Sequence, residues 1–203
     1  MKRAIIVHCW EGYPEYCWYP SVKKQLEEKG FSVEVPAFPE TDTPKREKWV
    51  PYFAEQVGRP DEELFLTGHS VGCITILRYL ESLPENVRVG GVVLVAGYTD
   101  DIGYKELSNF FETRIDFEKI RNKSKNGFVA IHSDNDPFVD LKYADIFQKK
   151  LGAEIITKNG MGHFSGEENC TNAPSKSCKI CWARMSDGAE AIRRTLTSKL
   201  CLL

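Results

Sequence analysis

Short apolar runs alternate along the chain with longer stretches in which apolar and polar residues recur at helical spacing. The apolar runs are mostly rich in β-branched or aromatic residues, which favours strands. They cover residues 3–9, 31–36, 64–67, 89–96, 127–132 and, with a weaker pattern, 153–157. Such apolar strands are typical of a parallel sheet that is covered on both faces. The alternation therefore predicts an α/β fold built from βα units.

Amphipathic helices are expected between and after these strands, where apolar residues are spaced by three and four. The helical stretches are 18–29, 45–57, 71–82, 141–151 and 187–200. Pro51 argues against the first half of the second helix, because proline lacks a backbone N–H and clashes with the preceding turn. Together the elements predict a three-layer sandwich with a mainly parallel sheet of five to six strands.

Two segments, 97–125 and 167–185, depart from the alternation. Part of the first, 98–117, is aromatic, and we expect short helices there that fold over a cleft. No repeat, low-complexity tract or Pro/Gly/Ser-rich linker divides the chain, and 203 residues suit one domain. We therefore expect a single domain over 1–203, with the cysteine-rich segment 167–185 inserted before the last helix.

Charge and cysteine content narrow the class of function. The net charge of −2 leaves no basic excess for nucleic acid or an anionic membrane, so a small-molecule partner is expected. No apolar stretch is long enough to span a membrane, and the run at 4–7 is too short for a signal peptide. Seven cysteines without an export signal favour free thiols and a cytoplasmic location.

The sequence Gly68-His69-Ser70-Val71-Gly72 matches G-x-S-x-G, with a predicted strand before it and a predicted helix after it. A sharp turn there forces strained dihedral angles on the serine and leaves room only for glycine two positions to either side. It would expose the Ser70 hydroxyl at a helix N-terminus, where the Val71 amide can donate to an oxyanion. The alternative is a glycine-rich turn with an ordinary serine.

A serine nucleophile needs a base to accept its proton, and the chain has four histidines. His8 and His132 lie in or at the ends of predicted strands, and His69 is fixed in the turn and should point away from the chemistry. His163 lies in a glycine-containing loop after the last predicted strand and is therefore the candidate base. A lone loop histidine without a catalytic role is the alternative.

The acid that orients this base should follow the strand before it, because this type of fold places the acid between serine and histidine in the chain. Asp136 is favoured, since Pro137 holds the preceding residue extended. Asp134 and Asp140 remain alternatives, as does a solvated turn. The predicted chemistry is attack by Ser70 with an acyl-enzyme intermediate.

A second oxyanion donor is expected in the loop after the first strand, where the backbone amide of Trp10 is the candidate. The glycine-rich run that is common in this loop among esterases is missing. Trp10, Phe138 and Phe164 are also candidate contacts for an apolar acyl or alcohol group. Aromatic side chains more often pack in a core, which is the alternative for all three.

These motifs resemble the small serine hydrolases that include retinoblastoma-binding protein nine and its bacterial relatives. The resemblance extends over about residues 3–166 and rests on His8-x-Trp10-Glu11, on 68–73, on 91–97, on 133–138 and on Gly162-His163-Phe164. It implies a compact α/β-hydrolase fold without a large lid domain, and an esterase-like activity. The L-x-C-x-E motif that links some members to the retinoblastoma protein is absent, so the resemblance implies no protein partner.

The chain departs from this family in the segment 169–185, which holds Cys170, Cys178 and Cys181. Together with Cys201 or His163, these thiols could bind zinc. Free thiols are favoured, so neither a metal nor another cofactor is expected. A zinc ligand at His163 would exclude that residue as the base.

The residues thus predict hydrolysis of a carboxylic ester or a related acyl bond. A thioester or peptide hydrolase would use the same residues. A non-catalytic protein-interaction module on a hydrolase fold is the alternative from a different class, since fold alone does not determine function. The ordered serine, acid and histidine favour the enzyme.

Overall fold

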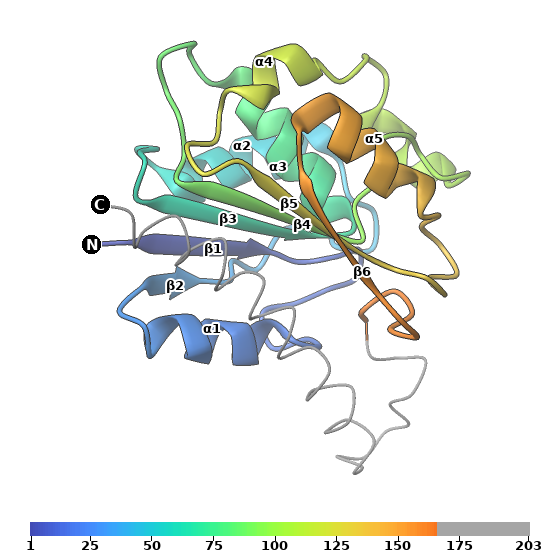
Figure 1. Cartoon of the computed structure of the whole chain (residues 1–203), viewed down its shortest axis with the longest axis horizontal. Coiled ribbons are helices and arrows are strands. Elements are labelled where there is room, and N and C mark those ends of the chain that lie inside the picture. Colours follow the sequence, from blue (N-terminus) through green and yellow to red (C-terminus); the bar gives the residue numbers. More distant parts are fainter. Residues whose placement is uncertain (166–203) are drawn as a thin grey trace.

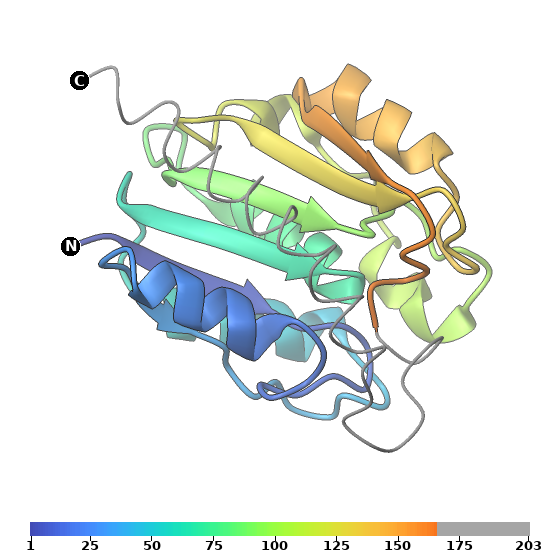
Figure 2. The same ribbon diagram turned by 60° about the horizontal axis from the view of Figure 1, so that its bottom comes forward.

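The protein is described here over residues 1–165, from a computed structural model. One parallel sheet has the strand order β2-β1-β3-β4-β5-β6. The strands are β1 (Arg3–Val7), β2 (Ser32–Glu34), β3 (Leu64–His69), β4 (Gly91–Val95), β5 (Phe128–Ser133) and β6 (Glu154–Lys158). All the arrows point the same way in Figure 2, so the carboxyl ends of the strands share one edge of the sheet. In open α/β folds this edge is where ligands bind.

Helices lie on both faces of the sheet, as Figure 1 shows: α1 covers one face, and α2, α3, α4 and α5 cover the other. Their bounds are α1 (Tyr19–Glu27), α2 (Arg46–Val57), α3 (Val71–Ser82), α4 (Phe117–Arg121) and α5 (Lys142–Leu151), with a 3-10 helix at Lys105–Phe110. The predicted three-layer α/β sandwich is confirmed. No helix within residues 1–165 is long and apolar enough to cross a membrane.

The predicted elements within 1–165 are present, and several bounds differ by one or two residues. The expected helix at 187–200 and the insertion at 167–185 lie outside the described residues. The expectation against the first half of the second helix is wrong, because α2 begins at Arg46 and continues through Pro51. Pro51 is exposed, whereas Trp49 and Phe53 on the inner side of the helix are fully buried. Their burial outweighs the missing backbone donor.

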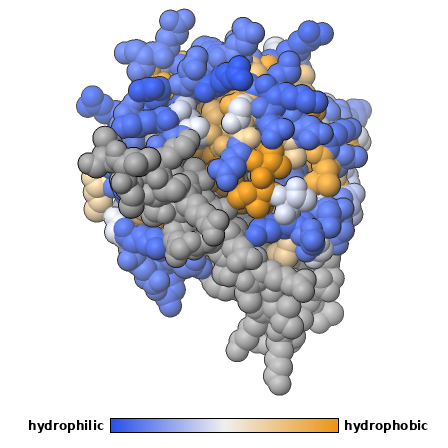
Figure 3. Space-filling model, viewed as in Figure 1, coloured by the Kyte–Doolittle hydropathy of each residue, from blue (hydrophilic) through white to orange (hydrophobic). Residues whose placement is uncertain are grey.

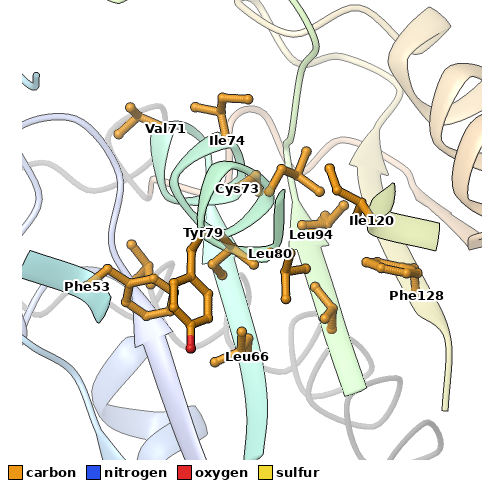
Figure 4. Packing of buried hydrophobic residues seen from close by; sticks show 14 of the residues in the cluster. Phe53, Leu66, Val71, Cys73, Ile74, Tyr79, Leu80, Leu94, Ile120 and Phe128 are labelled. Carbon is orange, nitrogen blue, oxygen red and sulfur yellow. The ribbon is translucent and has the colours of Figure 1, made fainter. Parts of the chain in front are cut away.

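The core consists of two apolar clusters, one on each side of the sheet. The larger cluster centres on α3, which is buried without interruption from Val71 to Leu80. Figure 4 shows side chains of α3, such as Ile74 and Leu80, packed with Leu66 of β3 and Leu94 of β4. The outer surface on the face in Figure 3 is mostly hydrophilic, with a small hydrophobic group near its middle. Burial of α3 holds the turn that precedes it firmly against the sheet.

The segment between β4 and α4 is fastened to α3 by a buried arginine. Arg78 donates hydrogen bonds to the carbonyl oxygens of Phe110 (2.9 Å), Thr113 (2.5 Å) and Arg114 (3.3 Å) and pairs with Glu81 at 2.7 Å. Five donors in a planar fork suit this set of acceptors. The short helices expected within 98–117 are represented by the 3-10 helix at Lys105–Phe110.

Candidate active site

Ser70 lies in a tight turn between β3 and α3, with φ 54° and ψ −118°. Positive φ is strained for a residue with a side chain, as the motif predicted. A Cβ on Gly72 would lie 2.3 Å from the carbonyl oxygen of Val7. A Cβ on Gly68 would lie 2.7 Å from the backbone nitrogen of Cys73. The predicted need for glycine at both positions is therefore confirmed.

The three residues expected to form a catalytic group meet at the carboxyl edge of the sheet. His163 Nε2 lies 3.0 Å from Ser70 Oγ, and His163 Nδ1 lies 2.9 Å from Asp136 Oδ2 and 3.1 Å from Oδ1. An ionised carboxylate only accepts hydrogen bonds, so Nδ1 carries the proton and Nε2 accepts from the serine hydroxyl. The Asp136 side chain is 1% exposed and that of His163 is 10% exposed. This arrangement can transfer a proton from serine to histidine.

Asp136 is held by the backbone that follows it. Its Oδ1 accepts hydrogen bonds from the amides of Phe138 (2.9 Å) and Val139 (3.0 Å). The two other carboxylates considered for this role bond elsewhere, Asp134 to the Gly160 amide and Asp140 to the Lys142 amide. Of the three carboxylates, Asp136 is therefore the one hydrogen-bonded to His163.

The loop that carries His163 is fixed by the last residue of β5 and by the residues that follow it. Three consecutive side chains there accept hydrogen bonds from backbone amides of the loop: Ser133 Oγ from Met161 (2.9 Å), Asp134 Oδ1 from Gly160 (2.8 Å) and Asn135 Oδ1 from Gly162 (2.8 Å). With Asp136 on the imidazole, four residues in a row bind this one loop. The sequence pattern indicated this run only as a source of the acid.

Two backbone amides were expected to serve as oxyanion donors. The Val71 amide is in the first turn of α3, where N–H groups have no intrahelical acceptor. Cys9 directly precedes Trp10 in the chain. Its carbonyl oxygen accepts hydrogen bonds from His8 Nδ1 (2.8 Å) and from the Gly12 amide (3.0 Å). Because a peptide group is planar, fixing this carbonyl also fixes the direction of the Trp10 N–H.

His69 was expected to point away from the chemistry, and its ring nitrogens indeed bond elsewhere than to Ser70. Its Nε2 lies 2.8 Å from the carbonyl oxygen of His163, and its Nδ1 lies 2.7 Å from the Tyr19 hydroxyl. Burial lowers the pKa of His69 to about 3, with a further contribution from the nearby His163. The side chain thus contacts the backbone of the candidate base, which the turn motif alone does not indicate.

Tyr98 is a residue near Ser70 that the sequence motifs did not indicate. It follows β4, is buried, and its hydroxyl makes no hydrogen bond within the described part of the chain. Burial raises the pKa of Tyr98 well above its usual value, while the neighbouring Ser70 side chain opposes that rise. The signal for it in the sequence is its place two residues beyond the predicted strand at 89–96.

The candidate aromatic contacts fall into two groups. Phe138 is 48% exposed, and its ring meets that of His163 edge-on at 5.2 Å between centroids. Trp10 is partly buried, with its ring 5.7 Å from that of Tyr104. Phe164 is only 4% exposed and packs in the apolar cluster on the α1 side of the sheet. Its ring is part of the core, so we do not include it among the proposed substrate contacts.

Within residues 1–165, no three His, Cys, Asp or Glu side chains are grouped as a metal site would require. The cysteines considered as zinc ligands, Cys170, Cys178 and Cys181, lie outside the described residues, as does Cys201.

Comparison with known proteins identifies the family. A family model described as "Serine hydrolase" matches residues 4–180. The chain belongs to the serine hydrolase family. Among curated proteins, this serine hydrolase is 28% identical over 174 residues to YdeN of Bacillus subtilis (strain 168), covering 85% of the chain and 91% of YdeN. It is 29% identical over 154 residues to "Serine hydrolase RBBP9" of Rattus norvegicus, covering 74% and 80% of the two chains.

Solved structures support the same assignment. The crystal structure of the B. subtilis ydeN gene product matches this serine hydrolase with a TM-score of 0.79 and 26% identity, over 92% of this chain and all of the other. Est1E from Butyrivibrio proteoclasticus, solved with ferulic acid bound, matches with a TM-score of 0.66 at 14% identity, over 95% and 90%. The latter likeness concerns the fold alone. The predicted α/β-hydrolase fold and the prediction of an enzyme are confirmed, and residues 1–165 contain no large lid.

Proposed function

We propose that this serine hydrolase cleaves a carboxylic ester or a related acyl bond through a triad of Ser70, His163 and Asp136. The observation that carries the proposal is the continuous hydrogen-bonded series from Asp136 through His163 to Ser70, at 2.9 and 3.0 Å. Serine is a weak nucleophile unless such a base accepts its proton. The arrangement matches the roles of nucleophile, base and orienting acid.

In the first half of the reaction, the Ser70 Oγ attacks the acyl carbonyl carbon while its proton passes to His163 Nε2. Asp136 stabilises the resulting imidazolium through Nδ1. The leaving alkoxide takes the proton from Nε2 as its bond to carbon breaks, which leaves an acyl ester on Ser70. Water then attacks that ester while His163 accepts its proton, and this proton passes to Ser70 Oγ as the acyl–oxygen bond breaks and the acid product leaves.

The negative oxygen of each tetrahedral intermediate needs hydrogen-bond donors that are already in place. We assign this role to the backbone amides of Val71 and Trp10. The helix dipole of α3 adds partial positive charge at Val71. The hydrogen bonds to the Cys9 carbonyl oxygen favour Trp10 as the second donor, because they fix the peptide group that contains the Trp10 N–H.

The surface around the site favours a substrate with an apolar group. Apart from Met1, the exposed large apolar residues of the described chain lie in loops after β1, β4 and β5: Tyr13, Tyr104, Phe138 and Leu141. Single exposed apolar residues are ordinary, but a concentration at a catalytic edge indicates a binding surface. We assign Phe138 and Trp10 to contacts with the acyl or alcohol group of a small molecule.

Labelling with a fluorophosphonate tests the nucleophile directly, because the reagent reacts with an activated serine. We expect modification at Ser70 only, located by peptide mass, and loss of labelling in Ser70→Ala and His163→Ala. Ser82→Ala removes a serine at the other end of α3, whose hydroxyl donates to the Tyr79 carbonyl oxygen, and should label like wild type. A folded protein that does not label would overturn the triad and favour a non-catalytic interaction module.

Substrate class is tested with matched p-nitrophenyl ester, thioester and p-nitroanilide compounds that carry the same short acyl group. We expect turnover of the ester, lost in Ser70→Ala and His163→Ala. Turnover of the anilide or thioester in preference to the ester would change the proposed bond while leaving the triad in place.

A further inference from the structure

A buried series of hydrogen bonds connects the loop after β1 to the loop that carries His163. The Cys9 amide donates to the Tyr19 hydroxyl oxygen at 3.0 Å, and the Tyr19 hydroxyl donates to His69 Nδ1 at 2.7 Å. His69 Nε2 then donates to the carbonyl oxygen of His163 at 2.8 Å. Each loop contains a group assigned to catalysis above, the Trp10 amide in one and the His163 imidazole in the other.

The chemistry of the atoms sets the direction of this series. A carbonyl oxygen only accepts hydrogen bonds, so His69 Nε2 must carry a proton. In a neutral imidazole Nδ1 is then an acceptor, and the Tyr19 hydroxyl must supply the hydrogen. Tyr19 and His69 are both fully buried, and burial keeps His69 neutral by lowering its pKa. The series therefore keeps one arrangement at neutral pH.

The contact at His163 lies next to a strained backbone position. Phe164, the following residue, has φ 59°, and a residue with a side chain adopts this only when its surroundings require it. The His69 donor binds the carbonyl between the imidazole-bearing residue and this strained residue. The two histidine rings also lie 5.3 Å apart between centroids. His69 thus restrains the backbone of the base, whereas Asp136 restrains its ring.

The hydroxyl of Tyr19 is needed for this link, whereas its ring is needed only for packing. Tyr19 belongs to α1 on one face of the sheet, and α3, which follows His69, lies on the other (Figure 1). A phenylalanine at position 19 would keep the apolar contacts of the ring. It would leave both the Cys9 amide and His69 Nδ1 without this partner.

We infer that Tyr19 and His69 are positioning residues that hold the base His163 and the oxyanion donor Trp10 in fixed places relative to Ser70. The inference rests on the proposed function, because that function gives His163 and Trp10 their catalytic roles. Small misplacements of reacting groups reduce the rate by large factors. Loss of the link should therefore lower kcat strongly and weaken substrate binding only slightly.

The first test is Tyr19→Phe, measured as kcat and KM for the p-nitrophenyl ester. We expect kcat to fall by about 10-fold or more and KM to change by less than about 2-fold. Tyr79→Phe is the matched control, because Tyr79 is also buried and its hydroxyl makes no hydrogen bond within residues 1–165. It lies among apolar side chains of the core (Figure 4) and should retain wild-type kcat.

The second test separates the two nitrogens of His69. In His69→Gln the side-chain amide can still donate to the His163 carbonyl, whereas His69→Leu removes that donor and the acceptor for Tyr19. We expect His69→Gln to retain a kcat several-fold above that of His69→Leu. Active sites are counted by fluorophosphonate titration, so that kcat refers to competent enzyme only.

The outcomes distinguish this inference from the proposed function. If wild type and Tyr79→Phe label and turn over while Tyr19→Phe keeps wild-type kcat, the triad stands and the positioning role is wrong. If titratable sites fall in parallel with activity, so that kcat per site is unchanged, Tyr19 only stabilises the fold and the positioning role is again wrong. If wild type itself neither labels nor turns over, the proposed function fails.

Discussion

The Asn135 side-chain oxygen accepts a hydrogen bond from the Gly162 amide at 2.8 Å, directly before the proposed base. The same oxygen accepts from the Ser133 hydroxyl at 2.8 Å. Gly162 has φ 51°, a left-handed conformation that glycine adopts readily. Asn135 thus restrains the loop at a glycine directly before the base, and the adjacent Asp136 restrains the His163 ring.

Asn135→Ala should lower kcat for ester hydrolysis by about 10-fold, because the loop that carries His163 loses a contact next to the base. Asn135→Asp keeps an acceptor for the Gly162 amide and should retain more of the activity. Steady-state kinetics of both variants, with urea unfolding to confirm that they are folded, check this. Equal kcat in Asn135→Ala and wild type would show that the other loop contacts suffice.

Gly72→Ala should destabilise the fold by about 3 kcal/mol or more, because the new Cβ would lie 2.3 Å from the Val7 carbonyl oxygen and force α3 away from β1. Gly103→Ala is the control. Gly103 has φ 85° and open space around it, so alanine there adds backbone strain of about 1 kcal/mol without a clash. Urea unfolding of the two variants measures the difference, and similar losses would contradict the close-approach argument.

The turn around Ser70 could be predicted from the sequence because its motif is local: the two glycines, the strained serine and the helix that follows all lie within one short segment. The steric reason for Gly68 lies in that segment, at Cys73, whereas the reason for Gly72 is the Val7 carbonyl oxygen of β1. The acid was harder to predict, since three carboxylates within 134–140 were candidates for that role. Pro137 pointed to Asp136, and the structure adds a stronger reason in the amides of Phe138 and Val139.

The link through Tyr19 could not be predicted because its partners are far apart in the chain. Tyr19 and His69 are separated by 50 positions, and His69 and His163 by 94. Apolar periodicity indicates which face of an element is buried but not which polar atoms meet inside. The position of Phe164 could not be predicted for a related reason: it adjoins His163 in sequence, yet its ring packs in the core, which was the alternative for this residue.

Arg78→Met should destabilise the fold by about 3 kcal/mol or more, because Glu81 and three backbone carbonyls lose a buried cationic donor. Arg88→Met is the matched control, since Arg88 forms an exposed pair with Glu62 at 2.7 Å and such pairs contribute about 0–1 kcal/mol. Chemical unfolding compares the two. A small loss in Arg78→Met would mean that the other contacts of the segment after β4, such as the hydrogen bonds of Asn109 with Arg46 and Pro44, are enough to hold it.

Acidification should destabilise the fold through its buried histidines. Burial lowers the pKa of His8, His69 and His132 below the ordinary value of 6.5, to about 3 for His69. Below pH 6.5 the unfolded chain therefore binds protons that the folded protein does not, so this contribution is complete above pH 6.5 and is lost progressively as the pH falls toward 3.

For His69 alone, the free energy of unfolding should fall by about 1.4 kcal/mol for each pH unit well below 6.5. Urea unfolding between pH 7.5 and 5 measures the total dependence, to which carboxylates and the other histidines also contribute. His69→Gln isolates one histidine, since its side chain cannot titrate but still offers a donor to the His163 carbonyl. The stability of His69→Gln should depend less steeply on pH than that of wild type, because unfolding of the variant takes up one proton fewer. Parallel curves for the two proteins would mean that folding leaves the pKa of His69 unchanged, and burial would then not be what keeps this ring neutral.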